Sequence, residues 1–219
     1  MPPFAYYQHL SPAEKEIYRR SEAVRSLRLP ASERLQPLVA TLAQALAGGE
    51  RGAITRATTG LGRELARALG APPVEIQVLE VRPRDSGEEL HGLYTLSSRG
   101  RARIRVWMRT AAQGRVVAFR TFLRTLLHEL CHHVDFTVLD LDPSFHTRGF
   151  FQRESSLFRQ LVPSARRRSA GSPAPDAAPP EATPTEAPDF AAIRDDALRE
   201  ALESLGRRLQ IHGPPRRGR

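Results

Sequence analysis

The 219-residue chain contains little cysteine, no long apolar run and almost no lysine. Because Cys131 is the single cysteine, an internal disulfide and a zinc ribbon built on four cysteines are both excluded. The apolar runs are too short to cross a bilayer, and the first residues, MPPFAYYQHL, lack the basic start and apolar core of a secretory signal. We therefore expect a cytoplasmic protein without a membrane partner.

Lys15 is the only lysine among 33 basic residues, and the formal net charge is +9. Such a charge permits contact with nucleic acid or with another acidic surface. Abundant arginine beside abundant alanine and proline is equally typical of a compositional bias, so the charge does not identify a partner. A hydrophobic content of 40% suits a buried core, and the length allows one domain with extensions.

The first part of the chain predicts helices. Ser11, Pro12 and Glu14 form the pattern of a capping box, so we expect a helix from residue 12 to about 27, before Pro30. Two more helices are expected at 32–48 and 51–69, because apolar residues recur there at helical spacing and glycines follow. We interpret residues 1–49 as an N-terminal helical extension.

Three later segments predict strands. Residues 74–81, 90–96 and 101–109 alternate apolar and polar side chains, and the last two are close enough to form a hairpin. Further helices are expected at 116–136 and 149–161, separated by a loop. The sequence therefore predicts an α+β fold in which a small antiparallel sheet packs on the helix at 116–136.

The strand at 101–109 has one face rich in arginine: Arg101, Arg103, Arg105, Trp107 and Arg109. Arginines beside a tryptophan can contact phosphates and a stacked base, which would make this face a nucleic-acid surface. The same pattern is typical of a solvated outer face whose charges protect an edge strand from aggregation. We favour the second interpretation.

The helix at 116–136 contains the sequence LLHELCHHVD, in which His128, Glu129 and His132 form an H-E-x-x-H motif. Residues four apart lie on one face of a helix, so the two imidazoles can bind one metal ion. Glu129, beside the first histidine, can then act as the general base on a water molecule. The motif is short, so its context decides whether it has this meaning.

A catalytic zinc site of this kind needs a third protein ligand. His146 follows His132 by fourteen residues and lies in a loop that can return to the metal, and Glu154 on the next helix is the alternative. We favour His146. Asp135 shares the ligand face and either supports a ligand or caps the helix, whereas His133 points about 100° away from His132 and is not expected to be a ligand. Cys131 is expected to be a small buried residue.

The sequences HELCH at 128–132 and HTRGF at 146–150 resemble the two motifs of the SprT-like zinc metalloprotease family. In that family the second motif reads His-Gly-x-x-Phe, so the spacing from His146 to Phe150 matches while the glycine is displaced by two residues. The resemblance covers residues 50–162 and includes no C-terminal zinc ribbon. It implies a zincin-like domain binding one Zn²⁺ ion through His128, His132 and His146, with Glu129 as the catalytic base.

The resemblance also implies a protein or peptide substrate, including proteins associated with DNA. Tyr94 is a candidate for assisting the oxyanion. Residues 163–188 are rich in proline and alanine and predict a disordered linker, and 189–219 predict an amphipathic helix with a basic tail. Two alternatives stay open: a metal-binding protein without proteolytic activity, and a basic nucleic-acid-binding module with a vestigial metal site. The oligomeric state is left open.

Overall fold

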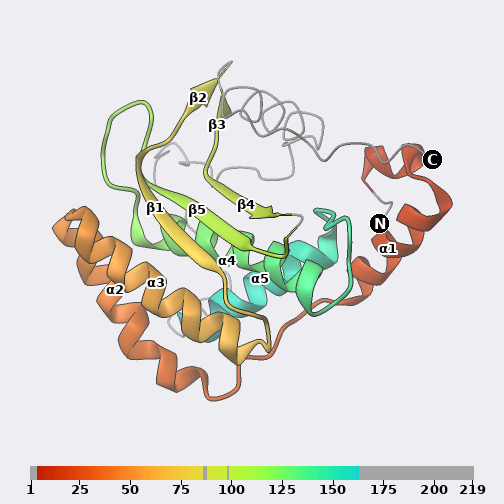
Figure 1. Cartoon of the computed structure of the whole chain (residues 1–219), viewed down its shortest axis with the longest axis horizontal. Helices are drawn as coiled ribbons and strands as arrows, with labels where there is room; N and C mark the ends of the chain where they lie inside the picture. Colours follow the sequence, from red (N-terminus) through yellow and green to blue (C-terminus); the bar gives the residue numbers. More distant parts are fainter. Residues whose placement is uncertain (1–3, 86–87, 98, 163–219) are drawn as a thin grey trace, which may run out of the picture. The chain divides into compact units, whose positions relative to one another are not determined.

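The computed structural model describes residues 4–85, 88–97 and 99–162 (Figure 1). The expected linker at 163–188 and the amphipathic helix and tail at 189–219 lie outside the described residues. The fold class is α+β, as predicted, with five α-helices and a three-stranded sheet in the described part. Within the same residues, no helix is both long enough and apolar enough to cross a membrane.

The first helices are η1 (Ala5–His9) and α1 (Pro12–Ala23). The predicted capping box is present: the Ser11 hydroxyl accepts from the Glu14 backbone N–H, and the Glu14 carboxylate accepts from the Ser11 backbone N–H. However, α1 ends four residues earlier than expected. The backbone carbonyls of Ser21 and Val24 accept hydrogen bonds from Arg153, and tertiary contacts therefore replace the last turn.

A helical hairpin follows. The second predicted helix starts as a short 3-10 turn, η2 (Ser32–Leu35), and continues as α2 (Gln36–Gly48), with Pro37 in the first turn where its missing N–H is tolerated. Gly49 ends α2 with φ of 71°, a left-handed conformation that glycine adopts without strain. Glu50 then caps α3 (Arg51–Ala68) by accepting from the backbone N–H groups of Gly52 and Ala53.

The sheet contains β1 (Glu75–Val81), β4 (Gly92–Leu96) and β5 (Ala102–Arg109) in the order β1-β5-β4. The predicted hairpin of β4 and β5 is confirmed. The sheet is mixed, however, and the prediction of an antiparallel sheet was wrong for β1, which pairs parallel to β5. The chain reverses direction between β1 and β4 and again before β5, so β5 returns parallel to β1. A ribbon of β2 (Arg84–Asp85) and β3 (Glu88–Glu89) occupies the first reversal.

Two helices complete the fold: α4 (Phe119–Thr137) and α5 (Arg148–Leu161). The sheet packs on α4, which also contacts α5, while α3 packs along β1 (Figure 1). α4 begins three residues later than expected because Val116 and Val117 pair with the end of β5.

One hydrophobic core joins these elements. The N-terminal segment that the sequence set apart as an extension supplies part of that core, and the described residues belong to one compact unit. Its contribution comes from five buried side chains: Leu29, Leu35, Val39, Leu42 and Leu46. Removing this segment would therefore expose the apolar faces of α4 and α5.

Candidate metal centre

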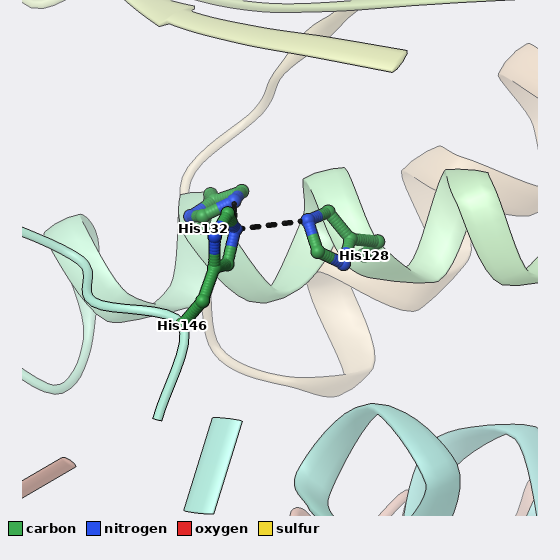
Figure 2. Close-up of side chains that lie close together, drawn as sticks. All are labelled: His128, His132 and His146. Atoms are coloured by element: carbon green, nitrogen blue, oxygen red, sulfur yellow. Dashed lines mark hydrogen bonds between the residues drawn. The ribbon is translucent and has the colours of Figure 1, made fainter. Parts of the chain in front are cut away.

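Three histidines from two segments of the chain meet at one point of the structure (Figure 2). His128 and His132 project from one face of α4, and His146 reaches them from the loop before α5. The Nε2 atom of His146 lies 3.1 Å from Nε2 of His128 and 2.9 Å from Nε2 of His132. The three expected zinc-binding histidines are therefore close enough together to hold one metal ion.

The rest of α4 fixes the first two histidines in place. Its opposite face consists of fully buried apolar side chains: Phe122, Leu123, Leu126, Leu127 and Leu130. His128 and His132 are four residues apart, so both rings stand on the remaining face. Phe150 of α5 packs against both rings, with ring centroids at 4.9 and 4.7 Å. The buried face of α4 fixes the helix and Phe150 packs on the rings, which leaves the two imidazoles little freedom.

Hydrogen bonds at Nδ1 determine which nitrogens of the two helical histidines carry a proton. Nδ1 of His128 lies 3.3 Å from a carboxylate oxygen of Glu154, which can only accept when ionised. Nδ1 of His132 lies 2.8 Å from the Ser144 hydroxyl, whose own proton is donated to Asp135 at 2.7 Å. Both Nδ1 atoms therefore donate, and both Nε2 atoms present lone pairs to the shared space.

This arrangement fits a metal ion. With Zn–N bonds of about 2.0–2.1 Å and tetrahedral angles, two ligand nitrogens are about 3.3 Å apart, close to the separations measured here. Imidazole binds a metal in its neutral form. Burial lowers the pKa of His146 to about 3, and burial together with the neighbouring histidines lowers the pKa of His132. For His128, burial lowers the pKa, but Glu154 and Glu129 outweigh it and raise the pKa overall.

Glu129 lies under strand β4 and is 6% exposed. Gly92 of β4 makes this position possible, because a Cβ atom at residue 92 would lie 2.8 Å from Cγ of Glu129 and 2.8 Å from Cγ2 of Thr125. Burial raises the pKa of Glu129 to about 7, although His128 and the backbone N–H of Tyr94 oppose that shift. A carboxyl group with such a pKa can exchange a proton near neutral pH.

A second set of polar residues supports the histidines from behind. Asp135, expected either to support a ligand or to cap the helix, is fully buried and accepts hydrogen bonds from the Ser144 hydroxyl and from Nε and Nη2 of Arg153, at 2.7–3.1 Å. It therefore holds His132 through Ser144. Sequence reasoning missed Ser144 and Arg153. The only signal for Arg153 was its place on the buried apolar stripe of α5.

The alternative ligand, Glu154, lies on a different side of the cluster. Its carboxylate binds Nδ1 of His128 and forms an ion pair with Arg124 at 3.2 Å. Among the described residues, the group able to hold a metal consists of the three histidines. The geometry thus places His146 beside the other two Nε2 atoms and gives Glu154 the role of orienting His128.

The neighbours that were expected to stay out of the cluster do so. His133 donates from Nε2 to the Pro72 carbonyl at 2.9 Å, so Nδ1 accepts the Tyr94 hydroxyl at 3.2 Å. Cys131 is a buried free thiol. Tyr94 was a candidate for assisting the oxyanion, but its hydroxyl group is hydrogen-bonded to His133 and does not lie at the three histidines. Only the backbone of Tyr94 reaches the centre, through Glu129.

The arginine-rich face is less open than a nucleic-acid platform requires. β5 is the central strand and not an edge, and Trp107 is only 6% exposed. Arg103 pairs with Glu75 at 2.9 Å, Arg105 hydrogen bonds Gln77 at 3.4 Å, and Arg109 pairs with Glu80 at 3.4 Å. Arg101 is exposed in the turn before β5. Arg103, Arg105 and Arg109 are therefore explained by their pairing with polar side chains of the neighbouring strand β1.

Comparison with protein-family models, with curated proteins and with solved structures finds no match to this chain. The SprT-like resemblance therefore rests on the two short motifs, HELCH and HTRGF.

Proposed function

We propose that the protein is a zinc-dependent metallopeptidase that hydrolyses peptide bonds in protein substrates. The observation that carries the proposal is the convergence of three Nε2 atoms, from His128, His132 and His146, beside the buried carboxyl group of Glu129. A general base next to a three-histidine site with one position left for water is the minimum equipment for hydrolysis.

Zinc bound by these histidines would supply a Lewis acid that polarises a carbonyl group and acidifies water. Glu129 takes a proton from the attacking water and gives it to the leaving amine. Glu154 and Ser144 hold His128 and His132 in the tautomer whose Nε2 carries a lone pair that can bind a metal. Gly92 leaves the space that the Glu129 side chain occupies.

The choice of zinc rests on ligand chemistry, because three imidazoles suit zinc but also other transition metals. The likeness of HELCH and HTRGF to the SprT-like motifs supports a peptidase, and by that likeness DNA-associated proteins are the substrates to test first. A single buried cysteine is consistent with our assignment to the cytoplasm.

Metal analysis of the purified protein tests the centre. We expect one zinc per wild-type chain, and little zinc in His132→Ala or His146→Ala. The exposed His9 provides a control, since His9→Ala should keep the metal. Equal, substoichiometric zinc in the wild type and in His132→Ala would refute the metal centre.

Hydrolysis is tested with Glu129→Gln, which keeps the three histidines. This variant should retain zinc and lose cleavage of a fluorescein-labelled casein probe. If the wild type binds zinc but cleaves neither the casein probe nor DNA-associated proteins, the non-proteolytic metal-binding alternative is favoured.

A further inference from the structure

The third histidine is held by a segment that has no regular structure of its own. Residues 138–147, here called the ligand loop, connect α4 to α5, and all of them are described and lie outside helices and strands. The position of His146 must therefore come from contacts with other elements. Figure 1 shows α1 beside this loop. We propose that α1 is a positioning element of the metal centre, which holds the ligand loop so that His146 meets His128 and His132.

α1 holds the start of the ligand loop through Arg20. The Arg20 guanidinium donates to the backbone carbonyls of Leu139 and Asp140, at 3.0 and 2.9 Å. Asp140 has φ of 52°, a left-handed conformation that is uncommon outside glycine. A bond to the carbonyls on both sides of that turn favours this conformation over the alternatives open to the loop.

α1 also holds the end of the ligand loop, next to the histidine itself. The hydroxyl groups of Ser21 and Thr147 are hydrogen-bonded at 2.9 Å, and both side chains are fully buried. The Glu22 carboxylate accepts from the backbone N–H of Arg148 at 2.9 Å. Thr147 also caps α5 by accepting from the Phe150 backbone N–H at 3.0 Å. The residue after His146 is thus fixed to two helices.

The approach of α1 to α5 is too close for a side chain between them. A Cβ atom at Gly149 would lie 2.9 Å from Cα and from the carbonyl oxygen of Glu22. Both of those atoms belong to the backbone, which cannot move aside as a flexible side chain can. Gly149 is the residue whose place in HTRGF departs from the SprT-like pattern, and in this chain it provides contact with α1.

Arg153 connects α1 to the ligands on α4. One end of its guanidinium donates to the carbonyls of Ser21 and Val24 at 3.0 Å, and the other end binds Asp135. Asp135 in turn holds Ser144, the partner of His132. α1 therefore contacts the groups that position two of the three histidines.

The role proposed for α1 rests on the proposed metal centre, so the zinc affinity of α1 variants tests it directly. Loss of groups that orient a ligand typically lowers metal affinity about 10- to 100-fold. We expect a loss in this range for Arg20→Ala/Ser21→Ala, measured by zinc competition with a chromogenic chelator. Arg20 lies at the exposed surface, so Arg20→Ala alone serves as the milder variant if the double variant fails to fold. It should weaken binding by at least about threefold.

Arg19→Ala is the matched control. Arg19 is the neighbouring residue of α1, pairs with Glu16 on the exposed face and does not bond to the ligand loop in the described structure. Its removal should leave zinc affinity unchanged.

If α1 acts by positioning His146, its effect on zinc affinity must depend on the presence of His146. In a His146→Ala background Arg20→Ala should cause no additional loss, because Arg20 bonds to the ligand loop and the histidine that this loop positions is gone. Unchanged affinity in Arg20→Ala and in the double variant, or the same loss with and without His146, would overturn the proposal for α1. Absence of zinc binding in the wild type would instead overturn the metal centre, so the two failures are distinguishable.

Discussion

Replacing Gly92 by alanine tests the geometry of Glu129 without any assumption about substrate or metal. The added Cβ would lie 2.8 Å from both Glu129 Cγ and Thr125 Cγ2, well inside van der Waals contact. Both neighbours stand on α4, so β4 and α4 must separate or Glu129 must change rotamer. Overpacking of this kind costs about 1–3 kcal/mol, and we expect Gly92→Ala to lower the free energy of unfolding by that amount.

The same substitution at Gly60 is the control. A Cβ at Gly60, inside α3, meets no atom within 4 Å, and alanine is the better helix former. Gly60→Ala should therefore raise the free energy of unfolding by about 0.5–1 kcal/mol. Urea denaturation can be followed by the fluorescence of Trp107, the single tryptophan, which is buried in β5.

Two results would refute the position assigned to Glu129. The first is a Gly92→Ala protein as stable as the wild type. The second is an equal cost of Gly92→Ala in a Glu129→Ala background, where one of the two contacts has been removed. If the position is right and the protein is a peptidase, Gly92→Ala should also reduce kcat by about 100-fold with zinc retained, since a small displacement of the base is enough for such a loss.

Three further predictions concern charge. Asp135→Asn leaves the Arg153 guanidinium buried without its carboxylate and should cost about 3–5 kcal/mol in urea denaturation, whereas Glu64→Gln, at an exposed ion pair, should cost less than about 1 kcal/mol. In metal-free protein the raised pKa of Glu129, about 7, contributes a fall of about 3 kcal/mol in the free energy of unfolding as pH rises from 4.5 to 7, while the lowered pKa values of His132 and His146 contribute with the opposite sign. The stability advantage of the wild type over Glu129→Gln should therefore shrink by about 3 kcal/mol over this range, and an advantage that does not change with pH would contradict the prediction. Hydrogen bonds from the backbone of Ala53 and Gly52 lower the pKa of Glu50. The ionised Glu50 cap therefore stabilises α3 at pH values above the ordinary pKa of glutamate, and this stabilisation is lost in acid. The melting temperatures of wild type and Glu50→Gln should differ at pH 7 and converge at low pH.

Local sequence patterns predicted most of the helices and strands and two of the three clustered histidines. Ser11 and Glu14 identified the first helix start, and the alternation of residues 101–109 identified β5, because capping and side-chain alternation are determined by neighbours along the chain. The spacing of His128 and His132 placed both on one face of α4 for the same reason. His146 could be proposed only from the resemblance and from the loop length.

What the sequence could not predict depends on contacts between distant segments. The end of α1 depends on Arg153, which is 129 residues beyond Val24. The parallel pairing of β1 with β5 depends on how many times the chain turns between them. In the sequence Gly92 resembles any glycine at the start of a strand. Only the packing of β4 on α4 shows that a side chain here would collide with Glu129. Ser144 has no pattern of its own, since a hydroxyl group becomes an orienting group only where a histidine and a carboxylate flank it.

The electrostatics of the cluster favour a cation over any arrangement of protons. One N–H on Nε2 of His146 can serve only one neighbour at a time, although both lie within 3.1 Å. The pKa of His128 is raised whereas the pKa of His146 is about 3, so a proton binds to His128 in preference to His146. A divalent cation accepts all three lone pairs at once, and the carboxyl groups of Glu129 and Glu154 lie close enough to favour its charge. A bound metal ion would therefore relieve an electrostatic cost of the metal-free fold, and its binding free energy would add to the free energy of unfolding.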